Sequence, residues 1–238
     1  MIEDIGAWMQ SLEDRLLSCF GSRLVFLGIQ GSYGRGEAHD GSDIDAVVIL
    51  DHVAPDDLQA YRTLLDTLPY RDRTCGFFSG LRELEHWERS DLFQLVQDTT
   101  SIIGDIGFLE DIICPEDVRR AVRIGACNIY HACGHNMVHE KSDEILRALY
   151  KSAIFTVQAV SYLQTGVYRK RRTDLLPVLR QSERAILETA CTLDGSHDGV
   201  QVNFDELSGD LLCWASDIIE EYSPDESETH MDGGGDNG

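Results

Sequence analysis

The chain has 238 residues, of which 42 are Asp or Glu and 20 are Lys or Arg, so its formal net charge is −22. Hydrophobic residues make up 42% of the sequence, which is enough for a folded core and excludes a wholly disordered chain. An acidic surface repels phosphate backbones and anionic lipids, so bulk nucleic acid and membranes are excluded as partners, whereas metal ions and cationic small molecules are favoured.

The N-terminal residues MIEDIGAW carry acids where a secretion signal carries Lys or Arg. The longest apolar run, Ala46 to Leu50, is too short to cross a bilayer. We therefore expect a cytoplasmic protein. The seven cysteines contain no C-x-x-C pair, which argues against a disulfide framework and against a zinc ribbon.

Residues 2–20 place their apolar side chains on one helical face and are followed by Gly21, so we predict an amphipathic helix. Buried strands are predicted over 24–29 and 44–50, with the glycine-rich stretch GSYGRGEAHDGSD between them. A helix over 55–68, a third strand over 74–79 and one or two short helices over 81–98 follow. Residues 1–111 are thus expected to form a mixed α and β domain.

Beyond residue 115 four stretches have helical periodicity, over 115–138, 142–165, 172–192 and 204–222. We predict that residues 112–222 form an up-and-down helical bundle. Residues 223–238 are rich in acids and end in MDGGGDNG, which indicates a disordered acidic tail. The predicted fold class is therefore α+β, an N-terminal mixed sheet with helices followed by a C-terminal helical bundle.

The segment between the first two predicted strands carries the chemistry. Gly31-Ser32 is followed after ten residues by Asp43-Ile44-Asp45, at the start of a hydrophobic strand. Because strand side chains alternate, Asp43 and Asp45 are expected on one side and Ile44 in the core. Two neighbouring carboxylates favour a cation, and Mg²⁺ accepts carboxylates together with water and phosphate oxygens. Gly31 permits close backbone approach and Ser32 adds a hydroxyl, so the segment predicts a metal–triphosphate site.

The stretch GSYGRGEAHDGSDIDAVVIL, with Ser42 before the first Asp, resembles the active-site segment of the nucleotidyltransferase superfamily. That superfamily includes DNA polymerase β and the kanamycin and lincosamide nucleotidyltransferases. The resemblance implies transfer of a nucleoside monophosphate from an Mg²⁺-bound nucleoside triphosphate to a hydroxyl, with pyrophosphate leaving. ATP is the expected donor and Mn²⁺ the alternative metal. The resemblance also implies that Asp43 and Asp45 hold the metal ions, and that Ser32 and the Gly31 backbone hold the terminal phosphates.

One element of the superfamily pattern is missing. Polymerase-like members carry a third carboxylate on a later strand, but the predicted strand TCGFFSG has none, and Asp72 and Glu83 flank it. Resemblance to the kanamycin-type enzymes implies a base from the helical domain. Glu140, Asp143 and Glu144 in HEKSDE are the candidates, and we favour Glu140. A polar turn capped by Ser142 explains the same residues equally well. A degenerate, inactive domain is the other alternative.

Three cationic features are candidates for phosphate binding. Lys151 lies in an otherwise apolar helix, where it either snorkels to solvent or faces a cleft, and relatives with a bundle lysine favour the cleft. The run Arg169 to Arg172 either meets phosphates or an acidic partner, or ends a helix in solvent. Arg35 either braces its loop or touches phosphate. Together with Gly31, Ser32 and Ser42 of the motif, Arg35 and Lys151 are the candidate nucleotide-binding residues.

A second polar pattern lies on the first bundle helix. Cys127, His131, His135 and His139 are spaced by four, so neighbours share a helical face, and a histidine pair at this spacing can chelate zinc. Each four-residue step turns by about 40°, so the four side chains cannot all reach one ion. We favour a structural or cleft-lining role over a zinc site.

The expected acceptor is a small hydroxylated molecule, with an antibiotic as one candidate, and the acidic chain favours a cationic one. Small nucleotidyltransferases of toxin–antitoxin pairs carry a similar motif, so a protein side chain is an alternative acceptor. The missing third carboxylate leaves open a regulatory module that binds nucleotide without turnover. Dimers are known among similar enzymes, which leaves a homodimer as an option.

Overall fold

The computed structural model describes residues 2, 4–195 and 203–224, and the chain divides into two compact units. The first unit is Met1–Asp117 together with Arg169–Asp174, and the second is Val118–Tyr168 together with Leu175–Gly238. The chain therefore leaves the second unit at residue 168, contributes six residues to the first unit, and returns. We call Arg169–Asp174 the return segment.

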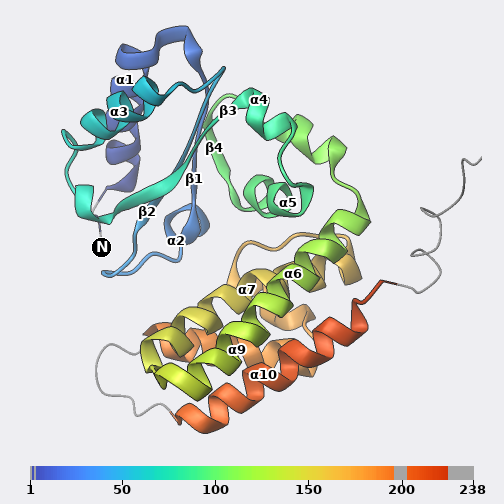
Figure 1. The fold of residues 1–238 in the computed structure, drawn as a ribbon. Coiled ribbons are helices and arrows are strands. Elements are labelled where there is room, and N and C mark those ends of the chain that lie inside the picture. The colour runs from blue at the N-terminus through green and yellow to red at the C-terminus, as the bar shows by residue number, and fades with distance from the viewer. Residues whose placement is uncertain (1, 3, 196–202, 225–238) are drawn as a thin grey trace, which may run out of the picture. The chain divides into compact units, whose positions relative to one another are not determined.

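The first unit is built on a mixed sheet of the strands β1 (Leu24–Gln30), β2 (Ile44–Leu50), β3 (Thr74–Gly80) and β4 (Thr100–Ile103) (Figure 1). Their order is β3-β2-β1-β4. β1 is antiparallel to β2 and β4, and β2 is parallel to β3. The three predicted strands are confirmed. β4 was not predicted, because its four residues TSII are too short to show alternation.

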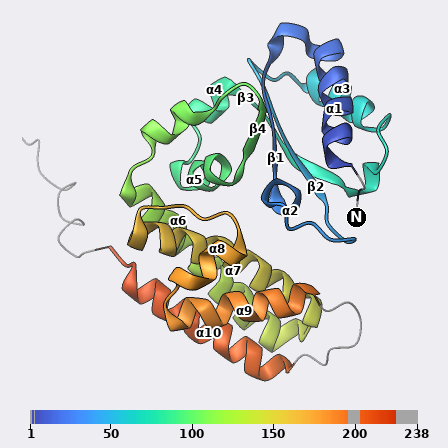
Figure 2. The ribbon, with the colours of Figure 1, turned by 180° about the vertical axis from the view of Figure 1, so that it is seen from behind.

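Helices cover both faces of this sheet (Figure 2). Residues 44, 46, 48 and 50 of β2 pack in one core with α1 and α3, whereas residues 47 and 49 pack in a second core with α4, α5 and the 3₁₀ helix η3. Successive residues of β2 thus alternate between two apolar layers, as strand geometry requires. The helices of this part of the chain are α1 (Ile5–Phe20), η1 (Gly21–Arg23), α2 (Gly31–Arg35), α3 (Pro55–Leu65), η2 (Arg71–Arg73), α4 (Leu81–Glu85), α5 (Arg89–Asp98) and η3 (Gly107–Ile112).

The opening helix α1 confirms the amphipathic pattern. Its first turn is capped by Asp4, whose Oδ1 accepts a hydrogen bond from Ala7 N at 2.8 Å. Leu12 and Leu16 on its inner face are fully buried against the sheet. The helix ends at Gly21, whose φ of +55° is left-handed and suits glycine.

The second unit is a helical bundle, as predicted. In its described part α7 packs against α9 and α10, and the Tyr150 hydroxyl of α7 donates to the Leu207 carbonyl at 2.9 Å. The elements beyond residue 114 are α6 (Pro115–His135), the π-helix η4 (Asn136–Glu140), α7 (Asp143–Thr165), α8 (Arg172–Leu175), η5 (Leu176–Val178), α9 (Gln181–Gly195) and α10 (Phe204–Glu221).

The prediction of a single helix over 172–192 was wrong. α8 ends at Leu175, a 3₁₀ turn follows, and α9 begins only at Gln181. Pro177 explains the interruption, because proline has no amide hydrogen to donate and its ring clashes with the preceding helical turn. Apart from Ser223 and Pro224, the predicted acidic tail lies outside the described residues. Among the described helices, none has the length and apolar character needed to cross a bilayer.

Candidate functional site

The Gly-Ser turn lies directly against the second carboxylate of the Asp-x-Asp motif. Gln30, the last residue of β1, pairs with Asp45 of β2, so Gly31 begins α2 beside the start of β2. Gly31 has a φ of +66°, and a Cβ built there would lie 2.0 Å from Asp45 Oδ2. Both the backbone conformation and the contact therefore require glycine.

The two aspartates of the motif lie at one edge of the sheet. Asp43 is exposed immediately before β2, and Asp45 is half-buried as its second residue. Ile44 between them is fully buried in the core shared with α1 and α3, so Asp45 faces the opposite side, as predicted from strand alternation. The carboxylates of Asp43 and Asp45 are hard oxygen donors of the kind that suits Mg²⁺ or Mn²⁺.

The neighbouring strand brings a thiol, and no carboxylate, to this edge. β3 runs parallel to β2 in a register that places Cys75 opposite Asp45, and Cys75 is exposed. The flanking acids lie off the strand, because Asp72 is in η2 and Glu83 is in α4. The position nearest to Asp45 on β3 is thus taken by cysteine.

Ser42 shapes the turn that leads into Asp43. Its side chain is buried, and its Oγ accepts a hydrogen bond from the His39 amide at 2.9 Å. The Ser42 amide donates in turn to the His39 carbonyl at 3.0 Å, and the Arg73 guanidinium donates to the Ser42 carbonyl. In this structure the Ser42 hydroxyl holds the loop before β2.

Arg35 is buried between two carboxylates. Its Nη1 donates to Asp98 Oδ2 at 3.0 Å and its Nε to Glu37 Oε2 at 3.3 Å, with 9% of Arg35 and 3% of Asp98 exposed. Asp98 Oδ2 also accepts from the Gly31 amide at 3.4 Å. Burial raises the pKa of Asp98, and the positive charge of Arg35 opposes that shift. Of the two roles that the sequence left open for Arg35, these contacts fit bracing of the loop.

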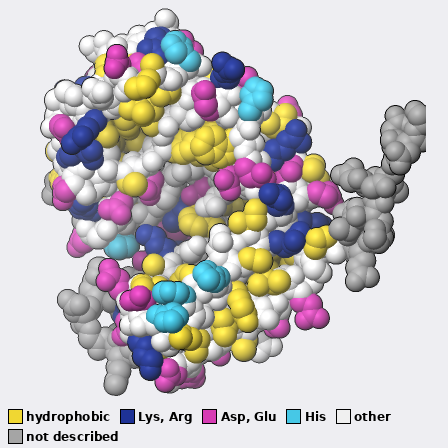
Figure 3. All heavy atoms as spheres, in the orientation of Figure 1, with side chains coloured by type: hydrophobic (Ala, Val, Ile, Leu, Met, Phe, Trp, Pro, Cys, Tyr) yellow, Lys and Arg dark blue, Asp and Glu magenta, His cyan; other side chains and the backbone are white. Residues whose placement is uncertain are grey.

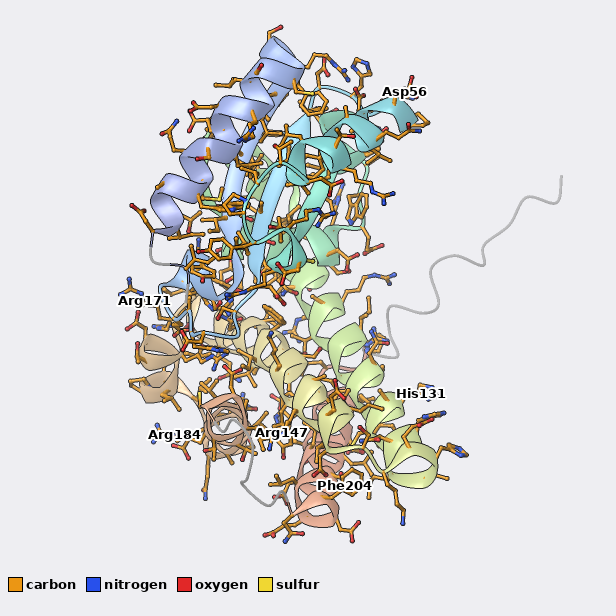
Figure 4. All side chains as sticks on the ribbon, turned by 90° about the vertical axis from the view of Figure 1, so that its left-hand side faces the viewer. Asp56, His131, Arg147, Arg171, Arg184 and Phe204 are labelled. Atoms are coloured by element: carbon orange, nitrogen blue, oxygen red, sulfur yellow. The ribbon has the colours of Figure 1, made fainter. Side chains whose placement is uncertain are left out.

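The basic run lies in the return segment and contacts the same loop. Lys170 Nζ donates to the Thr99 carbonyl at 2.7 Å, and burial lowers the pKa of Lys170. Arg171 Nε donates to the Arg35 carbonyl at 3.2 Å, and Figure 4 shows Arg171 at the edge of this unit. The run is therefore no extension of α7, which ends at Thr165.

Sequence reasoning missed Asp98 and Glu37. Asp98 is the last residue of an amphipathic helix and Glu37 lies in a glycine-rich loop, where acids are common. Nothing in the local sequence distinguishes them from solvated residues, because their partners lie up to 135 residues away in the chain.

Two predicted site residues lie in the helical unit. Glu140 is exposed at the end of η4, and Lys151 is exposed on α7. The Ser142 side chain accepts from the Ile145 amide at 3.3 Å, so the capped turn that was an alternative explanation of this segment is present. The catalytic role of Glu140 and the phosphate-binding role of Lys151 stay predictions.

Cys127, His131, His135 and His139, which we call the histidine ladder, lie on the surface of the second unit. Cys127 and all three histidines are exposed, and histidine side chains gather on the face shown in Figure 3. The His135 and His139 rings touch, with centroids 4.7 Å apart. Within the described residues, no three His, Cys, Asp or Glu side chains form a group that could hold a metal ion.

Comparison with known proteins agrees with the motif. The family model described as "Nucleotidyltransferase domain" matches residues 10–122. Among solved structures, the chain is similar to the spectinomycin adenyltransferase AAD(9) from Enterococcus faecialis, determined with ATP and spectinomycin. The two structures superpose with a TM-score of 0.58, over 90% of this chain and 100% of the other. Because their sequences are 13% identical, the similarity is one of fold. No curated protein matches the sequence. The predicted resemblance is confirmed: the chain carries a nucleotidyltransferase domain and is an enzyme of the nucleotidyltransferase class.

Proposed function

We propose that this enzyme transfers a nucleoside monophosphate from a nucleoside triphosphate, with ATP as the expected donor, to a hydroxyl of a small molecule such as an antibiotic. The observation that carries the proposal is the close approach of Gly31 to Asp45, because a backbone turn without a side chain then lies beside the second carboxylate of the Asp-x-Asp motif. Such a turn allows a triphosphate and its metal ion to approach the chain together.

The proposed reaction forms one bond and breaks one. The acceptor oxygen attacks the α-phosphorus, a new P–O bond forms, and the bond to the β-phosphate oxygen breaks so that pyrophosphate leaves. Ser32 and the Gly31 backbone hold the terminal phosphates. Asp43 and Asp45 would hold Mg²⁺, which neutralises phosphate charge when bound. The hydroxyl proton passes to a base, for which Glu140 is the candidate.

Two observations support a small acceptor that carries positive charge. The similar adenyltransferase was solved with ATP and spectinomycin, so an enzyme of this fold accommodates a nucleotide and an antibiotic. The net charge of −22 favours cations near the chain. We therefore propose hydroxylated, cationic antibiotics as the first acceptor class to examine.

The test is pyrophosphate release from ATP, GTP, CTP or UTP with Mg²⁺ and a panel of hydroxylated antibiotics, followed by the mass of each acceptor. We expect release with at least one pair and a nucleotidylated product. The Asp43→Ala/Asp45→Ala variant should lose release by about a thousandfold, because metal-assisted charge neutralisation contributes several kcal/mol. Arg184→Gln, an exposed position on α9, should retain it.

Three results would contradict the proposal. Release that leaves every small acceptor unmodified but adds mass to a protein would establish a protein acceptor. Tight nucleotide binding without release across the panel would establish a regulatory module. Release that the double substitution leaves unchanged would show that the site lies elsewhere.

A further inference from the structure

We propose that the return segment, Arg169–Asp174, positions the Gly31–Glu37 turn for triphosphate binding, a role that rests on the function proposed above. Three successive residues of the segment bond to this part of the unit. The side chains of Lys170 and Arg171 reach the Thr99 and Arg35 carbonyls, and the Arg172 amide donates to Glu37 Oε1 at 2.7 Å.

Glu37 joins the return segment to the turn. One carboxylate oxygen accepts from the Arg172 amide, while the other lies 3.3 Å from Arg35 Nε and 3.7 Å from Arg172 Nε. Glu37 is therefore shared by one cation of the turn and one of the return segment. Removing its negative charge would leave both guanidinium groups without this counter-charge in a partly buried place.

Asp98 connects Arg35 to Gly31 through hydrogen bonds. Its Oδ2 accepts from the Gly31 amide and from the buried Arg35 guanidinium, and the positive charge of Lys170 acts on the same carboxylate. Gly31 is thus held between Asp98 on its amide side and Asp45 on its Cα side. A shift of Arg35 or Lys170 would be transmitted to the turn that is proposed to hold the terminal phosphates.

The turn needs such support because its own helix is very short. α2 has five residues, and an isolated helix of that length is unstable in water. Its C-terminus is closed by Gly36, with φ +72°, and by Arg171, whose guanidinium donates to the last helical carbonyl. A cation at this end also interacts favourably with the helix dipole.

The discriminating variants are Glu37→Gln, with the exposed Glu188→Gln as matched control, and Lys170→Met. Glu37→Gln preserves side-chain shape and removes the shared charge. We expect amide hydrogen exchange over residues 31–37 to accelerate about tenfold, because a hydrogen bond to a neutral amide is weaker than one to a carboxylate. We expect Mg²⁺–ATP affinity, measured by calorimetry, to fall about tenfold, while affinity for AMP, which lacks the terminal phosphates, stays the same.

Three outcomes overturn the positioning role. The first is that amide exchange over residues 31–37 is as slow in Glu37→Gln and Lys170→Met as it is in the control Glu188→Gln. The second is faster exchange with unchanged Mg²⁺–ATP affinity, and the third is an equal loss for AMP. If the wild-type protein binds no triphosphate, the proposed function is wrong, and the exchange measurement alone then supports or overturns the hold of the return segment on the turn.

Discussion

The Gly31–Glu37 turn and the histidine ladder on α6 and η4 are both polar patterns in the sequence, but of the two the turn is the one whose hydrogen bonds, described above, join residues far apart in the chain. Around the turn, side chains from α5 and the return segment converge through bonds that span 63 to 136 residues of sequence. Along the ladder, Cys127 and the histidines stay exposed, and the contact is between the neighbours His135 and His139.

The difference follows from backbone geometry. A turn at the end of antiparallel strands lies where several elements end together, so short side chains from each can meet. Equally spaced residues on a helix drift around its axis, and here a π-helical turn begins at Asn136, before His139. Regular spacing on one helix is therefore weaker evidence for a site than a motif that joins two strands.

The largest expected effect is on Asp45. Asp45→Asn keeps the size of the side chain but removes the charge that would bind metal, so kcat for pyrophosphate release should fall about a thousandfold. His131→Asn on the ladder is the matched polar control and should keep the wild-type rate. Equal losses in the two variants would reverse the contrast between the turn and the ladder.

Gly31→Ala should reduce both stability and activity. Alanine would have to adopt the left-handed φ of this position, and its methyl group would clash with Asp45 Oδ2. We therefore expect a loss of about 1–3 kcal/mol in unfolding free energy. Gly134→Ala on α6 is the control, since its Cβ would meet nothing within 4 Å and alanine favours helix by about 1 kcal/mol. Urea unfolding of both variants should therefore shift in opposite directions, and a stable Gly31→Ala protein would contradict the contact.

Much of the fold could be predicted because its signals are local. The opening helix follows from the spacing of its apolar residues and from Gly21. The position of Asp45 follows from alternation around Ile44, which is fully buried as expected. The break at Pro177 was also visible in the sequence, because proline rarely continues a helix, but the surrounding periodicity outweighed it in our prediction.

The rest depends on tertiary contacts that no local pattern encodes. Asp98, Glu37 and Lys170 are ordinary polar residues until the folded chain brings them to the Gly31 turn. β4 is too short for a periodic signal and owes its existence to pairing with β1. Burial of Arg35 likewise requires α5 and the return segment, which lie far away in sequence.

Within the helical unit, Asn136 should matter for stability. It is 1% exposed, its side-chain amide donates to the Ser142 carbonyl at 2.9 Å, and its Oδ1 accepts from the Ser142 amide at 3.0 Å. Asn136→Ala should cost about 1–3 kcal/mol in urea unfolding, because two backbone groups lose their partner. The exposed Asn128→Ala on α6 should change little, and equal midpoints would show that the turn needs no such support.

A second long-range pair in the first unit predicts acid sensitivity. Asp57 accepts from Arg23 Nη1 and Nη2, both at 2.8 Å, and this holds the pKa of Asp57 well below its ordinary value of 3.8. Since the folded pKa is depressed, the stabilisation is present above about pH 4 and is lost as pH falls toward the folded value. Asp57→Asn should therefore flatten the decline of the melting temperature below pH 4. The neighbouring exposed Asp56→Asn should not, and parallel curves for the two variants would contradict the pairing.

The smallest effect is expected on the ladder itself. The His135 and His139 rings touch at the surface, and exposed substitutions that leave the backbone intact change unfolding free energy by about 0.5 kcal/mol or less. His135→Gln/His139→Gln should therefore leave stability and pyrophosphate release unchanged. Zinc analysis is carried out in the Asp43→Ala/Asp45→Ala background, so that the strand motif cannot contribute ligands. One equivalent of zinc that is lost in the His135→Gln/His139→Gln variant would show that an exposed pair of helical histidines is enough to bind a metal ion. The turn would then still differ from the ladder in gathering side chains from distant elements, but both would bind ligands.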